Sequence, residues 1–349
     1  MHGIFRAFFY EDEIMVKYFF TGGGSAAPER IETFSDKCWV DLVNPSDDEC
    51  EDIAKFTGIS EDMLKAALDE EERARCEFDD GNSMFIVDCP VIEENDDGGD
   101  IYSTLPLAII YNKKCIVTVC LKGNTVLKEF ITGREKIDTT KPLHFILTFM
   151  LNNAKRFLYC LKQIDRKTRR IQSEMEKTMR NTEIIQLLDL QNSLVYFSTS
   201  LNSNERVHEK LFKVEGVATR EEYLDLYEDV IIEGKQAIET CNIYKNILSV
   251  TMDAYGSVIS NNANDTMKTL TIMTILLAIP TMIAGFWGMN MPVPWQDGYT
   301  FAETGWWWLV VIGTLIVTVA IGAFIMKRNS QKPLRQKKRK KDKKDKKDR

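Results

Sequence analysis

The side chains most able to act on a ligand are threonine hydroxyls placed in an otherwise apolar stretch. Thr271, Thr274 and Thr281 lie in a run of 23 residues, from Thr269 to Met291, that holds no charged side chain. A helix of this length crosses the roughly 30 Å hydrocarbon core of a bilayer. Hydroxyl groups and the helix-breaking Pro280 are not needed against lipid, so their presence indicates a helix that lines a water-filled pore.

Other kinds of site have little support. The eight cysteines include no Cys-x-x-Cys pair and His2, His144 and His208 stand far apart, so no zinc site built by the protein is expected. We expect the cysteines to be reduced cytosolic thiols. Gly22-Gly23-Gly24 lacks the Lys-Ser or Lys-Thr of a phosphate-binding loop, which argues against a nucleotide site. No catalytic pair with a recognisable spacing occurs, so an enzyme is the class favoured least.

A second apolar run indicates a second membrane span. Residues 306–326 hold no charge over 21 positions and begin with three tryptophans, as a span does at the membrane interface. The loop between the runs, residues 292–305, has two acidic residues and no Lys or Arg, whereas Lys268 precedes the first run and basic residues follow the second. By the positive-inside rule, we expect a multi-pass protein of the cell (inner or plasma) membrane with both termini in the cytoplasm.

The positive charge of the chain is concentrated at its C-terminus. Residues 327–349 contain 14 Lys or Arg and three Asp, a net charge of +11, so the remaining residues carry a net −18 within the total of −7. A nucleic-acid-binding domain has basic residues spread through a folded region, and no nucleic-acid partner is expected here. We interpret the tail as a topology determinant that contacts lipid headgroups, which makes the lipid bilayer a partner of the protein.

The first 140 residues predict a cytosolic α/β domain. Ser46 and Glu49 have the spacing of a capping box that opens a helix near 47–57, and Ser60 is suited to cap a second helix at 61–72. Apolar runs bounded by turn residues predict strands of a mixed sheet. The expected strands cover residues 39–42, 84–92, 102–110 and 115–121.

Long helices are expected to follow as a stalk. No proline occurs between Pro142 and Pro280, and apolar residues recur three and four apart through this segment. A break near 214–216 leaves one arm at about 143–212 and a second helix from about 220 that continues into the first span. Such a helix must pack on copies of itself, so a homo-oligomer is expected. The predicted organisation is 1–140 α/β domain, 141–265 stalk, 266–290 first transmembrane helix, 291–305 external loop, 306–326 second transmembrane helix and 327–349 basic tail.

Gly288, Met289 and Asn290 stand at the outer end of the first span, after Trp287. Taken alone, the tripeptide also suits a helix C-terminus capped by Asn. With two C-terminal spans, a short acidic loop, a basic tail and a large acidic domain before them, the chain resembles the CorA family of magnesium channels. The resemblance implies a pentamer whose Gly-Met-Asn forms the selectivity filter. An Asn290 ring would hydrogen-bond the water shell of Mg²⁺ without neutralising its charge.

The resemblance also implies pore-lining positions below the filter. They match Asn264, Met267, Leu270 and Thr281, with Met267 and Leu270 as a hydrophobic gate. Spacing alone would equally suit ordinary packing of helix against helix for these two residues.

The same resemblance implies regulatory Mg²⁺ sites in the cytosol that hold the channel closed. The two family aspartates of the long helix match Asp229 and Asp253. Their partner position from the neighbouring subunit matches Ala66, which cannot bind a cation, so Asp69 or the acids at 70–72 are the substitutes. Mg²⁺ is thus expected as both the transported and the regulatory ion.

The leading interpretation is a channel through which Mg²⁺ enters the cell, with Co²⁺ and Ni²⁺ as further permeant candidates. One alternative is a transporter of zinc or another transition metal from the same superfamily, although relatives assigned to zinc tend to replace the residue that is Met289 here. A second alternative is a membrane-anchored sensor or scaffold, which would need neither polar residues in the first span nor Asn264 at its inner end.

Overall fold

The computed structural model describes residues 15–21, 27–94, 100–175, 181–214, 216–287, 311–320 and 323. The chain divides into two units, residues 1–252 and 253–349, and the boundary falls within a single long helix, α6 (Glu221–Trp287).

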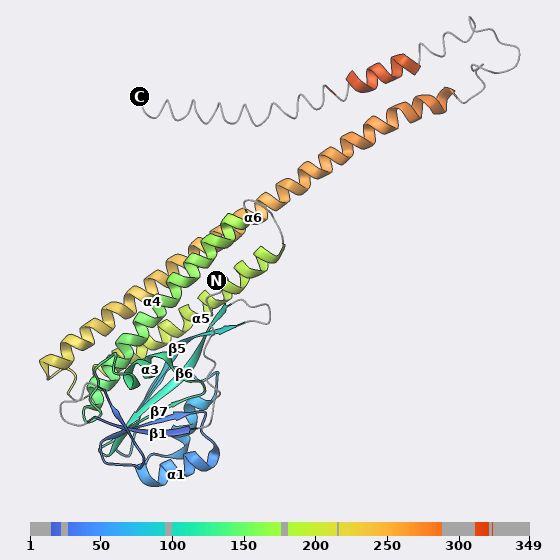
Figure 1. The fold of residues 1–349 in the computed structure, drawn as a ribbon. Coiled ribbons are helices and arrows are strands. Elements are labelled where there is room, and N and C mark those ends of the chain that lie inside the picture. Colours follow the sequence, from blue (N-terminus) through green and yellow to red (C-terminus); the bar gives the residue numbers. More distant parts are fainter. Residues whose placement is uncertain are drawn as a thin grey trace, which may run out of the picture. The chain divides into compact units, whose positions relative to one another are not determined.

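The first unit is built around a seven-stranded mixed sheet (Figure 1). The strand order is β2-β1-β3-β7-β6-β5-β4, and the pair β3 and β7 is parallel whereas all the other pairs are antiparallel. The strands predicted from the apolar runs are therefore confirmed as β3, β5, β6 and β7. The strand bounds are β1 Met15–Phe20, β2 Glu29–Ile31, β3 Cys38–Val43, β4 Arg75–Asp79, β5 Asn82–Glu94, β6 Asp100–Tyr111 and β7 Cys115–Cys120.

The central strands are apolar because helices cover both faces of the sheet. All six residues of β7 are buried, as a strand with a layer on either side requires. One apolar cluster lies between the sheet and α1–α2, and a second one lies between the sheet and α3, α4 and α5. Trp39 is fully buried in the second cluster, where its indole donates to Thr118 Oγ1 at 2.8 Å and thereby links β3 to β7.

The helices of one face begin at the caps that the sequence predicts. Ser46 and Glu49 form both halves of a capping box at the start of α1 (Asp47–Thr57), and Ser60 caps α2 (Glu61–Lys65). The helix expected at 61–72 is too long, because α2 gives way to a 3-10 turn, η1 (Ala66–Leu68), and the backbone is extended at Asp69. This turn buries Ala67 completely in the apolar cluster below the sheet.

Two helices, not one arm, cover the other face. The single arm expected at 143–212 is wrong: α4 (Pro142–Met175) and α5 (Asn181–Leu211) are separate helices that contact each other (Figure 1). Both helices also contact β5 and β6. Because the segment is divided into two helices, two apolar helix faces cover the sheet, whereas one straight helix would supply a single face. The short α3 (Thr125–Ile131) packs beside α4.

The second long helix is confirmed. The 67 residues of α6 form one helix, which is about 100 Å long at the standard rise. In the second unit, the described part of the chain after α6 is a short apolar helix, Val311–Ala320. Apart from residue 323, the rest of the predicted second span, the external loop and the basic tail lie outside the described residues.

Candidate functional site

The predicted pore-lining residues share one side of α6. At about 100° of rotation per residue, Asn264, Met267, Leu270 and Thr281 fall within a sector of roughly 120°. All four are exposed in the single chain, and Met267 and Leu270 each keep 62% of their surface accessible. Two large apolar side chains on an uncovered helix face need a partner, which is lipid or another copy of α6.

The threonine hydroxyls of α6 are bonded to their own helix. Thr271, Thr274 and Thr281 donate to the carbonyl groups four residues earlier, at 2.8, 2.9 and 2.8 Å. The single hydroxyl proton of each is therefore used, and the lone pairs that remain can only accept hydrogen bonds. Water bound to a metal cation donates its protons outward, so these hydroxyls suit a hydrated cation.

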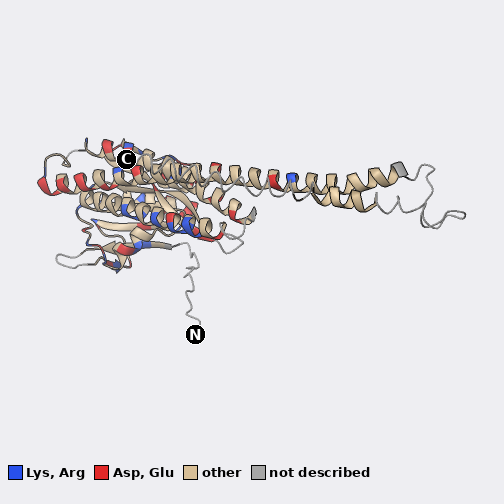
Figure 2. Ribbon diagram, turned by 90° about the horizontal axis from the view of Figure 1, so that it is seen from above, with Lys and Arg blue, Asp and Glu red and all other residues tan. Residues whose placement is uncertain are grey.

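The C-terminal half of α6 has the composition of a membrane span. It holds an 18-residue window of mean hydropathy 1.7, and none of that window is buried within the chain; α6 is the one helix among the described residues that meets the length and polarity of a span. Lys268, paired with Asp265 at 2.7 Å, is the last charged residue of the helix. Figure 2 shows the uncharged stretch that follows this pair.

The predicted filter residues Gly288, Met289 and Asn290 lie outside the described residues, because α6 is described only as far as Trp287. Their assignment as a filter stays a prediction.

The proposed regulatory acids are exposed, and they lie far apart in the sequence. Asp229 lies in the first third of α6, and Asp69 follows η1, where its Oδ1 accepts from the Glu71 amide at 3.0 Å. Asp253 belongs to the second unit, where its carbonyl accepts from Ser257 Oγ at 3.1 Å. Within the ranges described, no three or more His, Cys, Asp or Glu side chains are grouped to hold a metal ion.

The beginning of α6 carries a strong negative charge. Seven acidic residues and one basic residue occur between positions 221 and 239, and Figure 2 shows this acidic stretch. Its exposed carboxylates attract cations and repel a neighbouring copy of the same helix. A divalent cation would relieve that repulsion. The acids are Glu221, Glu222, Asp225, Glu228, Asp229, Glu233 and Glu239.

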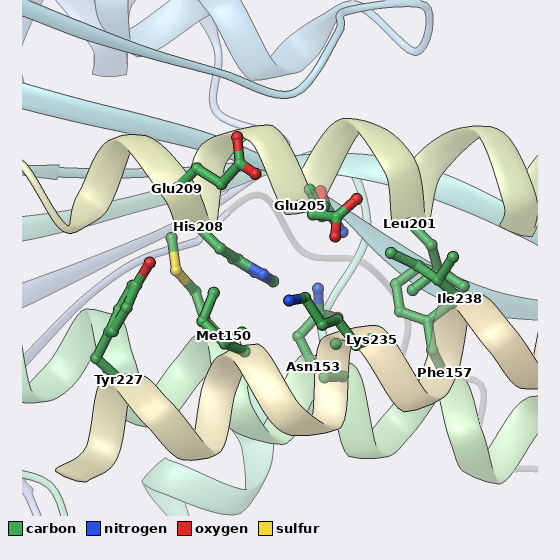
Figure 3. Close-up of a pocket in the computed structure, with 14 residues that line it drawn as sticks. Met150, Asn153, Phe157, Leu201, Glu205, His208, Glu209, Tyr227, Lys235 and Ile238 are labelled. Atoms are coloured by element: carbon green, nitrogen blue, oxygen red, sulfur yellow. The ribbon is translucent and has the colours of Figure 1, made fainter. Parts of the chain in front are cut away.

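A cavity of about 270 Å³ lies beneath α6, among α4, α5 and α6 (Figure 3). Its wall is mostly apolar, with Asn153, Glu205, His208 and Lys235 among the polar side chains that reach it. Sequence reasoning missed this site because its residues come from three helices. The one local signal was the three-residue spacing of Glu205 and His208, which places both on one face of a helix.

The chain is similar to known proteins over most of its length. The family model of the CorA-like Mg²⁺ transporter protein matches residues 35–328. The cobalt/magnesium transport protein CorA of Methanocaldococcus jannaschii is 27% identical over 301 residues, which cover 83% of this chain and 90% of that protein. The Thermotoga maritima protein of the same name is 23% identical over 292 residues, 81% of each chain.

The fold is similar to that of two solved structures. The complete structure of the CorA magnesium transporter from Methanocaldococcus jannaschii matches with a TM-score of 0.73 at 23% identity, over 90% of this chain and 98% of that chain. The soluble domain of the same protein matches with a TM-score of 0.60 at 21% identity, over 69% of this chain and 96% of that one. The chain therefore belongs to the family of CorA-like Mg²⁺ transporter proteins, whose members are membrane transporters and not enzymes.

Proposed function

We propose that this protein is a channel that lets Mg²⁺ enter the cell, with Co²⁺ and Ni²⁺ as further permeant ions. The observation that carries the proposal is the continuity of α6, which runs as one helix from an acidic segment to an apolar span with hydroxyl acceptors. The relatives from Methanocaldococcus jannaschii and Thermotoga maritima, named for cobalt and magnesium transport, support the choice of ions.

The pore is formed by several copies of α6, and a pentamer is the arrangement that the resemblance favours. The exposed Met267 and Leu270 support this assembly, because a ring turns two uncovered apolar side chains per chain toward one axis. In the ring, Asn264 and Thr281 contact the waters of the passing ion, and Gly288, Met289 and Asn290 form the outer filter. Both chain ends are cytoplasmic in this arrangement.

The chemistry of Mg²⁺ favours such a filter. The ion is small and loses its water slowly, so a ring of carboxylates that replaced the water would bind it too tightly to release it. Asn290 amides and threonine oxygens accept hydrogen bonds from the shell and leave the ion hydrated. The narrow part of the path is the apolar girdle of Met267 and Leu270, where a hydrated ion finds no polar partner.

Intracellular Mg²⁺ closes the channel by bridging acidic groups of neighbouring chains. Asp229 is exposed on the acidic part of α6, and Asp69 is an exposed acid that takes the place of the uncharged Ala66. Asp253 supplies a second regulatory carboxylate farther along α6. The net −18 of the chain without its tail makes a ring of copies dependent on bound cations.

Ion uptake by liposomes that contain only this protein tests the proposal. With a Mg²⁺-sensitive dye inside, we expect uptake down an imposed gradient that is absent from protein-free liposomes, with Co²⁺ and Ni²⁺ also entering. Uptake of Zn²⁺ without Mg²⁺ would favour the zinc transporter instead. A protein that assembles in the membrane and passes no divalent cation would be a sensor or scaffold, and the channel proposal would be wrong.

A further inference from the structure

Asn153, which lines the cavity beneath α6, has a buried amide oxygen with no donor. Asn153 of α4 is only 3% exposed, and its Nδ2 donates to the Asp88 carbonyl at 2.9 Å. Its Oδ1 has no hydrogen-bond partner among the described residues. Leaving such an acceptor unsatisfied is unfavourable, so the oxygen indicates a ligand that donates a proton or is itself a cation.

His208 of α5 presents a neutral imidazole to the same cavity. The side chain is 6% exposed, and burial lowers the pKa of His208 to about 4, so the ring carries a free lone pair at neutral pH. The ring lies close under α6: a Cβ added to Gly234 would be 3.4 Å from Nδ1 of His208. Within the described part of the chain, no group forms a hydrogen bond with this imidazole.

Glu205 completes a set of metal-ligand types. It lies three residues before His208 on α5, the spacing by which Glu-x-x-His pairs hold metal ions inside helix bundles. Together the three side chains offer a carboxylate, an imidazole nitrogen and an amide oxygen, from two helices that line one cavity.

We propose that this cavity binds one divalent transition-metal cation, of the Co²⁺, Ni²⁺ or Zn²⁺ type, through His208, Glu205 and the amide oxygen of Asn153, with water as the remaining ligands. An imidazole ligand favours these ions over Mg²⁺, which prefers oxygen ligands only. The site would thus bind a transition-metal cation in preference to Mg²⁺.

Lys235 would weaken metal binding at this site. Figure 3 shows the Lys235 side chain reaching from α6 toward the imidazole of His208, beside Asn153. Its ammonium group competes electrostatically with a metal ion, and because it is exposed, it can move into solvent when an ion binds. Because the site has few protein ligands and Lys235 competes with the ion, metal binding is weak. Weak binding suits a site that is occupied only when the transition metal is in excess.

The position of the site gives it a regulatory role. The cavity lies under α6, the helix that continues into the membrane span, so an ion that joins α4 and α5 beneath α6 changes the packing of the pore helix. This consequence rests on the proposed channel function, whereas binding itself does not.

Visible absorption of Co²⁺ added to the full-length protein in detergent tests the binding. We expect a Co²⁺ band with nitrogen-ligand character that reaches one equivalent per chain. The band should be lost in His208→Gln and weakened at least tenfold in affinity in Glu205→Gln, a partly exposed residue whose change spares the core. The matched control His144→Gln alters the other described histidine and should leave the band unchanged. A band that persists in His208→Gln would overturn the proposal.

Two further measurements sharpen the test. Zn²⁺ should displace Co²⁺ at similar concentrations, whereas Mg²⁺ should need at least a hundredfold excess. Lys235→Met should tighten Co²⁺ binding about tenfold. Displacement by equimolar Mg²⁺, or no change in Lys235→Met, would contradict the assigned ligands. Mg²⁺ flux into liposomes is measured separately. A wild-type protein that gives no Co²⁺ band but conducts Mg²⁺ rejects this site alone, and a wild-type protein that gives the band but conducts no Mg²⁺ rejects the channel alone.

Discussion

Asn153 of α4 and Asn204 of α5 donate to the same carbonyl, that of Asp88 in β5, at 2.9 and 2.8 Å. The Asp88 amide in turn donates to Asn204 Oδ1 at 2.9 Å, so Asn204 pairs with this strand residue as a neighbouring strand would. Asp88 lies two residues beyond Ile86, where the pairing of β5 with β4 ends. The two asparagines therefore satisfy backbone groups at an open strand edge and fix both helices on the sheet.

Replacing Asn204 with Leu should destabilise the first unit. The change removes two hydrogen bonds and leaves the Asp88 amide buried without its acceptor, at a cost of about 2–4 kcal/mol. We expect the midpoint of thermal unfolding, followed by circular dichroism, to fall by several degrees. Asn202→Leu, at an exposed position on the same helix, should change the midpoint little and serves as the control. Equal midpoints for the two variants would show that the pairing with Asp88 contributes no stability.

His208 should make the fold sensitive to acid. Its pKa is about 4 in the folded chain and about 6.5 when unfolded, so the unfolded chain binds more protons between these values. The stability from the neutral imidazole is complete above pH 6.5 and is lost as the pH falls toward 4, by about 2–3 kcal/mol at pH 4.5.

Burial raises the pKa values of the Asp41 and Asp88 carboxyls to about 6, so these two groups stabilise the folded chain as the pH falls, whereas His208 destabilises it. The contribution of His208 is therefore measured by comparing the wild-type chain with a variant that lacks this histidine. Between pH 7 and 4.5, His208→Gln should lose less stability than the wild-type chain. The same loss in both would mean that the imidazole is protonated in the folded protein.

The local features of the fold could be predicted from sequence because they depend on neighbouring residues. Ser46 and Glu49 form their capping box within one helical turn, and the apolar runs of β5 and β6 are long enough to identify as strands. The helix from about 220 was predictable for the same reason, since its proline-free periodic pattern leaves no other economical structure.

Features that depend on tertiary packing were not predictable. The segment between α4 and α5, residues 176–180, contains neither Pro nor Gly, so nothing in it marks the division of the arm. The cavity residues Asn153, His208 and Lys235 come from three helices, and only the fold brings them together. The filter and the regulatory acids were assigned by resemblance, and they stay predictions.

Replacing Asp229 should weaken the feedback by Mg²⁺. In Asp229→Ala, one carboxylate per chain is lost, so bridging Mg²⁺ holds the closed arrangement less well and conducting states gain. In Asp229→Lys, an ammonium group can substitute for the bridging cation and keep the channel closed. Protection of the protein from protease by Mg²⁺ measures this closure. Protection that is the same in wild type and Asp229→Ala would contradict a regulatory role for Asp229.

Opening the apolar girdle should raise the flux of the closed channel. Leu270→Gly widens the predicted constriction and Met267→Ser wets it, so a hydrated ion loses its main barrier. We expect both variants to conduct Mg²⁺ at high internal Mg²⁺, the condition under which we propose that the wild-type channel is closed. Leu276→Gly, at a residue on the side of α6 opposite the proposed pore face, is the control. Background flux in both Leu270→Gly and Met267→Ser would place the barrier elsewhere and leave these residues as packing contacts.

The most direct test of the channel is Mg²⁺ flux into liposomes that contain either the wild-type protein or Asn290→Ala, at equal amounts of assembled protein. In the proposed channel, a ring of Asn290 amides would order the water shell of the entering ion, and the packing of the preceding part of α6 would not depend on this side chain. We predict that selective Mg²⁺ uptake is abolished in Asn290→Ala while the oligomer, measured by size-exclusion chromatography, remains intact. Unchanged Mg²⁺ flux in Asn290→Ala would contradict the filter at the end of α6.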